Sequence, residues 1–329
     1  MKWCAGIILF LVSGIIQATE PAGVAETTRI WRTQHEQQIL TEFSDLLAIP
    51  DLASDTANIQ KNATMIRALL EKRGLKTKLL TLPEVPPIVI GDFPVPGAKR
   101  TLAFYAHYDG QPVDPAKWKS DPWVPVMRDA SGRDLDWQHA PAIDPEWRLY
   151  ARAAGDDKAP IIAMLAALDA LRANELAPKV NIRFVFEGEE EAGSPHLAQF
   201  LAKYPKDLRP EAWILCDGPV HQSGRAELFF GARGTVDLEL TIYGPIKGLH
   251  DGHYGNWVPN PVMRLTHLLD SMRDESGHIL IKGFYDDIKP PSEAELTALK
   301  KIPDMAADLR REFQIGATEG DGKPLNELL

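Results

Sequence analysis

The sequence predicts an α/β fold with a mixed, mostly parallel central sheet flanked by helices. Apolar segments with strand character recur at residues 101–106, 149–155, 180–186 and 213–216, and each runs directly into a polar turn. Residues 159–173 are apolar on nearly every side, which is typical of a helix buried against a sheet. Because open α/β sheets bind their ligands at such strand ends, we expect the functional site there.

Periodicity and capping signals predict the other elements of the first domain. Apolar residues at helical spacing indicate a helix over residues 30–47, and a second helix begins near Ala57. Ser194, followed by proline, is typical of a helix N-cap, so a helix should cover residues 196–204. Residues 114–145 form a long insertion, and loops of that length in compact domains are usually functional.

A second domain is predicted after Arg233, because a chain of 329 residues with 44% hydrophobic residues is long enough for two domains. Alternating apolar and polar positions indicate strands, while Asn and Ser at capping positions indicate helix starts. The predicted elements are strands over residues 236–242 and 279–284, a helix after Asn260, and a helix from the capping box at Ser292 to about Phe313.

The first residues are typical of a secretory signal peptide over residues 1–18. Lys2 supplies the charged start, the apolar stretch 5–16 is short for a bilayer span, and Ala18 suits a cleavage site. We therefore expect a secreted or periplasmic protein without membrane contact after cleavage. An uncleaved anchor stays open, because Ile16 is large for its position two residues before Ala18.

Charge decides between broad classes of partner. The formal net charge is −10, whereas binding to nucleic-acid phosphates requires a basic surface. A nucleic-acid partner is therefore not expected, and an acidic soluble enzyme is the ordinary expectation.

An acidic run over residues 187–191 directly follows the strand segment 180–186. Carboxylates packed at a strand end repel one another, so they either spread into solvent or surround a cation, and a divalent metal is the strongest local charge available. Each neighbouring motif alone is more often a turn, a helix cap or a solvated charge run. The polar ends of the other strand segments favour the metal, since they supply His107, Asp109, Asp156, Asp157 and Asp217.

In this order, the segments resemble peptidase family M20, the zinc aminoacylases and peptidases with the pattern H-x-D, D-D-K, E-E-x-G-S and a later Asp or Glu. The carnosinase-like dipeptidase branch is the most similar, through the residues 107–112 followed by Trp118 and the segment 121–123. The resemblance covers residues 28–329. It implies a catalytic domain over residues 19–233 and an inserted α+β lid, or dimerisation, domain over residues 234–329.

The resemblance also implies a dinuclear zinc site, and manganese or cobalt would suit the same ligand types. His107 and Asp217 would bind one metal ion. Glu191 would bind the other, and Asp156 would bridge the two. A bound water would then lie between the metals, with its pKa lowered.

Three further residues receive catalytic roles from the resemblance. Glu190 would be the general base. Asp109 would accept the second ring N–H of His107 and so fix its tautomer. His250 of the lid would reach into the site of a partner subunit and stabilise the developing oxyanion, so a homodimer through the lid is expected. Near His250, Asp251 and Asn256 depart from the family's Ser and Gly.

The implied activity is hydrolysis of an amide bond in a dipeptide or short peptide. An N-acyl amino-acid deacylase of the same fold is an alternative. An inactive fragment or binding module is another, because the chain stops inside the expected lid and lacks the family's last metal-binding His and the C-terminal part of the catalytic domain. We therefore expect a truncated gene product with an incomplete ligand set for one metal.

Overall fold

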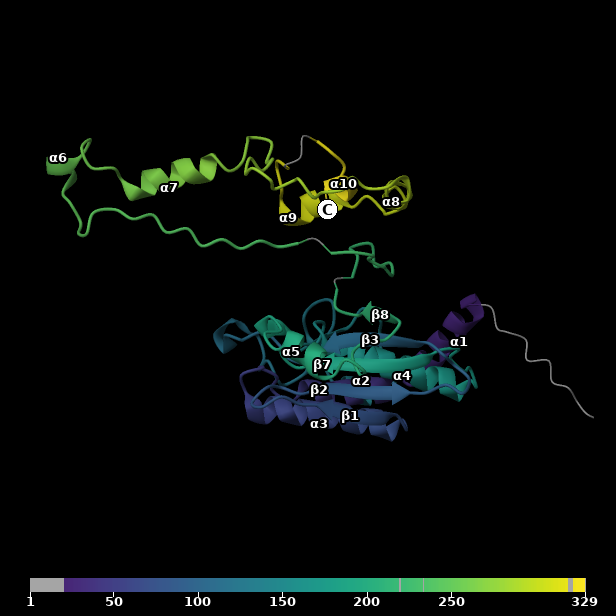
Figure 1. Cartoon of the computed structure of the whole chain (residues 1–329). Coiled ribbons are helices and arrows are strands. Elements are labelled where there is room, and N and C mark those ends of the chain that lie inside the picture. Colours follow the sequence, from purple (N-terminus) through teal and green to yellow (C-terminus); the bar gives the residue numbers. More distant parts are fainter. Residues whose placement is uncertain (1–20, 219, 233, 319–321, 329) are drawn as a thin grey trace, which may run out of the picture. The chain divides into compact units, whose positions relative to one another are not determined.

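The computed structural model of the protein describes residues 21–218, 220–232, 234–318 and 322–328. The chain divides into two compact units, of which the first ends at Gly218 (Figure 1). This division falls before the boundary predicted near Arg233, because β8, the last strand to join the central sheet, ends at Leu215. Arg233 itself lies outside the described residues, as does the predicted signal peptide of residues 1–18.

A five-stranded sheet forms the centre of the first unit, in the order β1-β2-β7-β3-β8. β2 runs antiparallel to both of its neighbours, whereas β3 runs parallel to β7 and to β8. All strands of this sheet except β2 therefore point the same way, which confirms the predicted mixed, mostly parallel sheet. The strands are β1 (Lys76–Leu80), β2 (Ile88–Phe93), β3 (Thr101–His107), β7 (Asn181–Glu187) and β8 (Ala212–Leu215).

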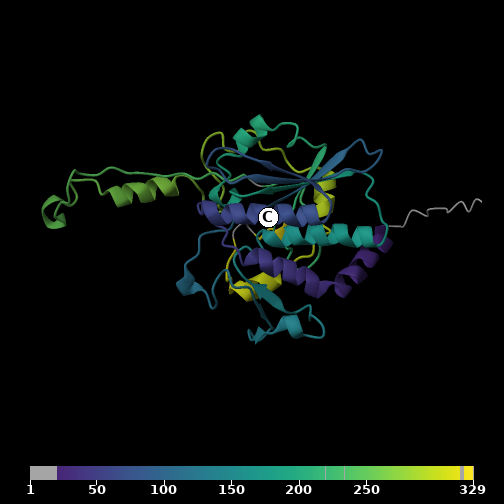
Figure 2. The ribbon, with the colours of Figure 1, turned by 90° about the horizontal axis from the view of Figure 1, so that it is seen from below.

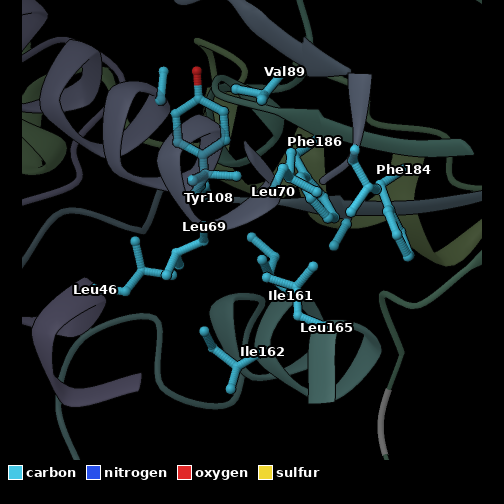
Figure 3. Packing of buried hydrophobic residues seen from close by; sticks show 14 of the residues in the cluster. Leu46, Leu69, Leu70, Val89, Tyr108, Ile161, Ile162, Leu165, Phe184 and Phe186 are labelled. Carbon is cyan, nitrogen blue, oxygen red and sulfur yellow. The ribbon is translucent and has the colours of Figure 1, made fainter. Parts of the chain in front are cut away.

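Helices cover both faces of this sheet (Figure 2), because successive strand residues point to opposite sides. Phe184 and Phe186 of β7 pack in one cluster with residues of α2, α3 and α4, including Ile161 (Figure 3). Val185 lies in a second cluster with Phe200 of α5. The helices are α1 (Pro21–Gln34), α2 (Glu36–Leu47), α3 (Thr56–Lys72), α4 (Lys158–Ala173) and α5 (Leu197–Lys203).

Two of the predicted helices begin or continue differently in the structure. The helix predicted over residues 30–47 is divided at His35, whose backbone leaves the helical conformation and whose ring stacks on Trp31 with centroids 4.0 Å apart. The helix predicted over residues 196–204 is α5, and its N-cap residue is His196. Ser194 does not cap it, because its φ of 49° belongs to the turn that precedes the helix.

The insertion predicted as a long loop and the residues that follow it form a small antiparallel sheet with the order β5-β4-β6. Arg128 of β4 lies over the ring of Tyr150 of β6, at 4.7 Å from its centroid. The strand predicted over residues 149–155 is therefore shorter and belongs to this sheet, because it pairs with β4 rather than with the central sheet. The elements are the 3-10 turns Pro115–Lys117 and Trp137–His139 and the strands β4 (Val126–Arg128), β5 (Asp134–Leu135) and β6 (Arg148–Tyr150).

The second unit contains helices but no named strand among its described residues. Asn260 caps α7, and Ser292 with Glu295 forms the predicted capping box of α8. The helix predicted to reach Phe313 ends at Leu299, since Pro303 cannot donate a helical hydrogen bond, and α9 follows. The helices are α6 (Asp251–Tyr254), α7 (Pro261–Asp270), α8 (Glu293–Leu299), α9 (Ala306–Phe313) and α10 (Leu325–Leu328).

The strands predicted over residues 236–242 and 279–284 do not form in the structure. In the described part of this unit, β-pairing is limited to an isolated bridge between Arg273 and Ile279. A strand is stabilised by the hydrogen bonds of a neighbouring strand, and the alternating segment has none in the described chain. Across the described ranges, no helix combines the length and apolar character needed to cross a lipid bilayer.

A buried arginine ties together the three helices on one face of the sheet. Arg73, which ends α3, donates to Glu42 of α2 at 2.6 Å and to Asp169 of α4 at 2.7 Å. Burial raises the pKa of Glu42, but hydrogen bonds from Lys72 and Arg73 outweigh it, so the pKa is lowered overall. The contribution of this carboxylate to stability is therefore present above its unfolded-state pKa and is lost as the pH falls through the lower folded-state value.

We expect Glu42→Gln to lower the free energy of unfolding by about 1.5–3 kcal/mol at pH 7, because a charged hydrogen-bond acceptor is lost. The difference from wild type should shrink at pH 3, because Glu42 is then largely protonated in the unfolded state and the stabilisation is lost as the pH falls toward the lowered folded-state pKa. Urea unfolding of both proteins at the two pH values measures this. An equal difference at both pH values would show that the charge of Glu42 does not stabilise the fold.

Candidate metal centre

The carboxyl ends of three parallel strands meet at one edge of the central sheet (Figure 1). His107 is the last residue of β3 and lies opposite Glu187, the last residue of β7. The backbone N–H of Tyr108 donates to the Glu187 carbonyl at 2.8 Å, so the segments that follow β3 and β7 begin side by side. Asp217 follows shortly after the end of β8, beside β3. The topology thus brings the predicted residues of three distant segments to one place.

The fourth segment comes from the turn before α4 and not from a strand of the central sheet. Asp156 Oδ1 lies 2.9 Å from Nε2 of His107. Asp157, joined to Asp156 by a cis peptide bond, accepts the backbone N–H of His107 at 3.0 Å. Both acids therefore contact the same histidine, one at its ring and one at its backbone.

His107 is fully buried, and its Nε2 faces a ring of carboxylates. Glu190 Oε2 lies 3.8 Å and Asp217 Oδ2 4.0 Å from this nitrogen. Their side chains are only 36% and 34% exposed, whereas that of Asp156 is 70% exposed. The cluster is therefore open to solvent on the side of Asp156.

Among the residues that the structure describes, two groups of side chains are able to hold a metal ion, and both contain His107. One group is His107, Asp156 and Glu191, and the other is His107, Asp157 and Asp217. In each group the ligand atoms lie within 4.8 Å of one another. Imidazole nitrogen and carboxylate oxygen are ligands that zinc accepts, so the donor set fits a divalent metal. Asp157, which sequence reasoning assigned no ligand role, belongs to the second group.

The carboxylates perturb one another and the histidine. Burial lowers the pKa of His107, but the hydrogen bond and charge of Asp109, with further carboxylates, outweigh it and raise the pKa to about 10. Burial raises the pKa of Asp157 to about 7 and also raises the pKa of Glu190. The cluster therefore holds excess negative charge around a single imidazole, which is an environment that favours a cation.

Asp109 lies beside the ring of His107, as expected, and has a second role. The ring Nδ1 of His107 lies 3.1 Å from the backbone carbonyl of Asp109, and 3.4 Å from its carboxylate. The two carboxylate oxygens also accept the backbone N–H groups of Glu190 and Glu191, each at 3.0 Å. Asp109 thus orients the histidine and also holds the short 3-10 turn Glu190–Ala192 that carries both acids.

Asp109→Asn is expected to lower the affinity of the site for a divalent metal ion by about 10- to 100-fold, the range for groups that orient metal ligands. The amide keeps one carbonyl oxygen and therefore loses an acceptor for Glu190 or Glu191. A zinc titration in competition with a chromophoric chelator measures the affinity of the variant. An unchanged affinity would show that the turn keeps its place without the second acceptor.

Two neighbouring side chains escaped the sequence reasoning. Gln111 donates from Nε2 to Glu191 Oε2 at 2.6 Å, which orients that carboxylate toward the cluster. Glu189 is buried rather than solvated, and it lies 2.9 Å from Nδ1 of His196. His196 therefore has a carboxylate partner rather than only solvent. Neither contact had a signal in the sequence, because each depends on how the turn after β7 folds.

His250 belongs to the second unit and is described there by itself. Its Nδ1 accepts the backbone N–H of Gly252 at 3.1 Å, and it occupies the N-cap position of α6. The side chain is 69% exposed. Its predicted catalytic role in a partner subunit stays a prediction.

Sequence comparison places the chain among peptidases. It matches the model described as Peptidase family M20/M25/M40 over residues 103–310. The Beta-Ala-His dipeptidase of Homo sapiens is 32% identical over 222 residues, which cover 66% of this chain and 40% of that protein. The Cys-Gly metallodipeptidase dug1 of Schizosaccharomyces pombe is 27% identical over 277 residues, covering 80% and 54%. The chain thus spans about half the length of these relatives.

Solved structures share the fold. The M20 family metallo-carboxypeptidase Sso-CP2 from Sulfolobus solfataricus gives a TM-score of 0.65 at 26% identity, over 88% of this chain and 62% of that one. Human carnosine dipeptidase 1 gives 0.62 at 24% identity, over 94% and 65%. The family model spans more than half of the chain and includes every predicted metal ligand. The protein therefore belongs to peptidase family M20/M25/M40.

Proposed function

We propose that this chain is a metal-dependent hydrolase that cleaves the amide bond of dipeptides or short peptides, with two zinc ions at the strand ends. One observation carries the proposal: a buried histidine is surrounded by carboxylates from three further segments at ligand distances. The two relatives named as dipeptidases support the substrate class. Manganese or cobalt would suit the same donors.

His107 with Asp217 would hold one ion and Glu191 the other, and Asp156 and Asp157 would supply further carboxylate oxygens. When bound, the metals polarise the scissile carbonyl and lower the pKa of a water molecule. Glu190 would take the proton from the attacking water and deliver it to the leaving nitrogen. Its position at the edge of the cluster, partly open to solvent, suits this transfer.

We further propose that His250 of a second copy of the chain stabilises the oxyanion, so the active form would be a homodimer through residues 234–329. The exposed side chain of His250 is compatible with a partner. From the N-terminal sequence, we also propose that the protein is secreted or exported to the periplasm and that its signal peptide is cleaved after residue 18.

A test combines metal binding with hydrolysis. The full 329-residue chain is purified without metal, titrated with zinc, and assayed with a β-alanyl dipeptide, a cysteinyl dipeptide and an N-acetyl amino acid. Two bound zinc ions with dipeptide turnover are the expected result. Turnover of the N-acetyl amino acid alone would replace the dipeptidase by a deacylase. Absence of zinc binding would reject the metal-dependent hydrolase.

A second candidate is a metal-binding module without turnover. It is favoured because both ligand groups rely on the same His107, and neither group contains a second histidine within the described chain. Nε2 of His107 can bind only one ion, so a second ion would have carboxylate ligands alone, whereas a catalytic zinc site normally includes a nitrogen or sulfur ligand. Binding of a single zinc without hydrolysis of any of the three substrates would support this candidate.

A further inference from the structure

A buried ion pair joins the start of α4 to the loop after α2. Nζ of Lys158 lies 2.8 Å from Oδ2 of Asp51, and neither side chain is exposed. The ammonium also donates to the backbone carbonyl groups of Leu46 at 3.1 Å and Ile49 at 3.3 Å. The donors of Lys158 are thus satisfied by the loop that carries Asp51.

Such a pair is a costly way to stabilise a core. Removing both charges from water carries a large desolvation penalty, and apolar residues of similar volume often stabilise a fold equally well or better. Burial lowers the pKa of Lys158, and the charge of Asp51 opposes that effect. The location of the pair, rather than its contribution to stability, therefore suggests its role.

The pair is directly connected to the metal ligands on its lysine side. Lys158 follows Asp156 and Asp157, the two acids that contact His107. Its backbone N–H donates to the carbonyl of Ala153 at 3.1 Å, which closes the turn that carries both acids. A shift of Lys158 would therefore move Asp156 and Asp157 relative to His107.

The pair is equally connected to the histidine turn on its aspartate side. The backbone carbonyl of Asp51 accepts the N–H of Gly110 at 3.0 Å, next to Asp109. The fit is tight, because a Cβ added to Gly110 would lie 2.8 Å from Oδ1 of Asp51. Trp123 Nε1 approaches the same oxygen at 3.4 Å. The side chain of Asp51 is thus fixed between the lysine and the turn after β3.

We propose that Asp51 and Lys158 form a positioning pair for the metal centre. The pair holds the turn with Asp156 and Asp157 at a set distance from the turn with His107 and Asp109, and so sets the affinity for zinc. Neither residue belongs to a candidate ligand group. This inference rests on the proposed function, because it assumes that the cluster binds zinc.

The test compares zinc affinity with stability in the full chain. Asp51→Asn keeps the shape of the side chain and removes its charge, so we expect zinc affinity to fall by about 10- to 100-fold in a competition titration with a chromophoric chelator. Glu42→Gln is the matched control. It breaks the ion pair between Glu42 and Arg73, and neither of these residues contacts a predicted metal ligand. The control should lose stability and keep the wild-type zinc affinity.

A double variant separates positioning from folding. Asp51→Leu with Lys158→Met replaces the pair by apolar side chains, and it is expected to regain the thermal stability that the single variant loses. Its zinc affinity should stay low, and the visible spectrum of its cobalt form should differ from that of wild type. Wild-type affinity in this folded double variant, or in Asp51→Asn, would overturn the positioning role while leaving the hydrolase proposal intact. Failure of the wild-type chain to bind zinc would reject both.

Discussion

Glu190→Gln is expected to lower kcat for dipeptide hydrolysis by a factor on the order of 10²–10⁴, the usual contribution of a general base. The amide has the shape of the carboxylate but cannot accept the proton of the attacking water. Glu190 belongs to neither candidate ligand group, although its Oε2 lies 3.8 Å from Nε2 of His107. Zinc binding should therefore be retained. Steady-state kinetics and zinc stoichiometry on the same sample measure both quantities.

A matched control for Glu190→Gln is available on the surface of α3. Glu71 pairs with Arg67 on the surface of α3, so Glu71→Gln removes a carboxylate without touching the cluster. Its kcat should equal that of wild type. Loss of zinc together with activity in Glu190→Gln would make Glu190 a ligand instead of the base, and retention of kcat would remove it from the mechanism.

The sequence carried enough information to place the ligands but not their supports. His107, Glu191 and Asp217 follow strand ends, and the carboxyl ends of parallel strands must meet at one edge once the order of the sheet is set. Asp157 is read from the sequence alone as an ordinary helix start, because its bond to the backbone of His107 exists only after folding. Asp51 lies in a distant loop and had no signal at all.

Local signals were also more reliable than pairing signals in the second unit. Asn260 and Ser292 cap the helices predicted from them, since a cap depends on residues within one turn. The alternation of apolar and polar residues over 236–242 is typical of a strand with one buried face, but it does not specify a neighbouring strand to which the segment could hydrogen-bond. In the first unit, the predicted segments 101–106, 180–186 and 213–216 do pair with one another in the central sheet, whereas the segment 149–155 pairs in the small sheet instead.

Replacing His107 by alanine is expected to abolish zinc binding, because both candidate ligand groups depend on this histidine as their nitrogen donor. Zinc affinity should fall by more than about 100-fold, the upper end of the effect for groups that only orient a ligand. Each remaining group would consist of carboxylates alone, which lack the nitrogen donor that catalytic zinc sites normally contain. Equilibrium dialysis against zinc, with circular dichroism to verify folding of the buried site, measures the outcome.

Two further variants, each altering one ligand group, serve as comparisons for His107→Ala. Glu191→Gln alters only the group with Asp156, and Asp217→Asn alters only the group with Asp157, so each variant should keep one zinc ion. Loss of both ions in either variant would mean that the two groups form one mononuclear site. Retention of one ion in folded His107→Ala would mean that the carboxylates find a different nitrogen donor, and the shared histidine would then no longer define the centre. The stoichiometries of the three variants therefore decide between a dinuclear centre built around a single histidine and a site of another composition.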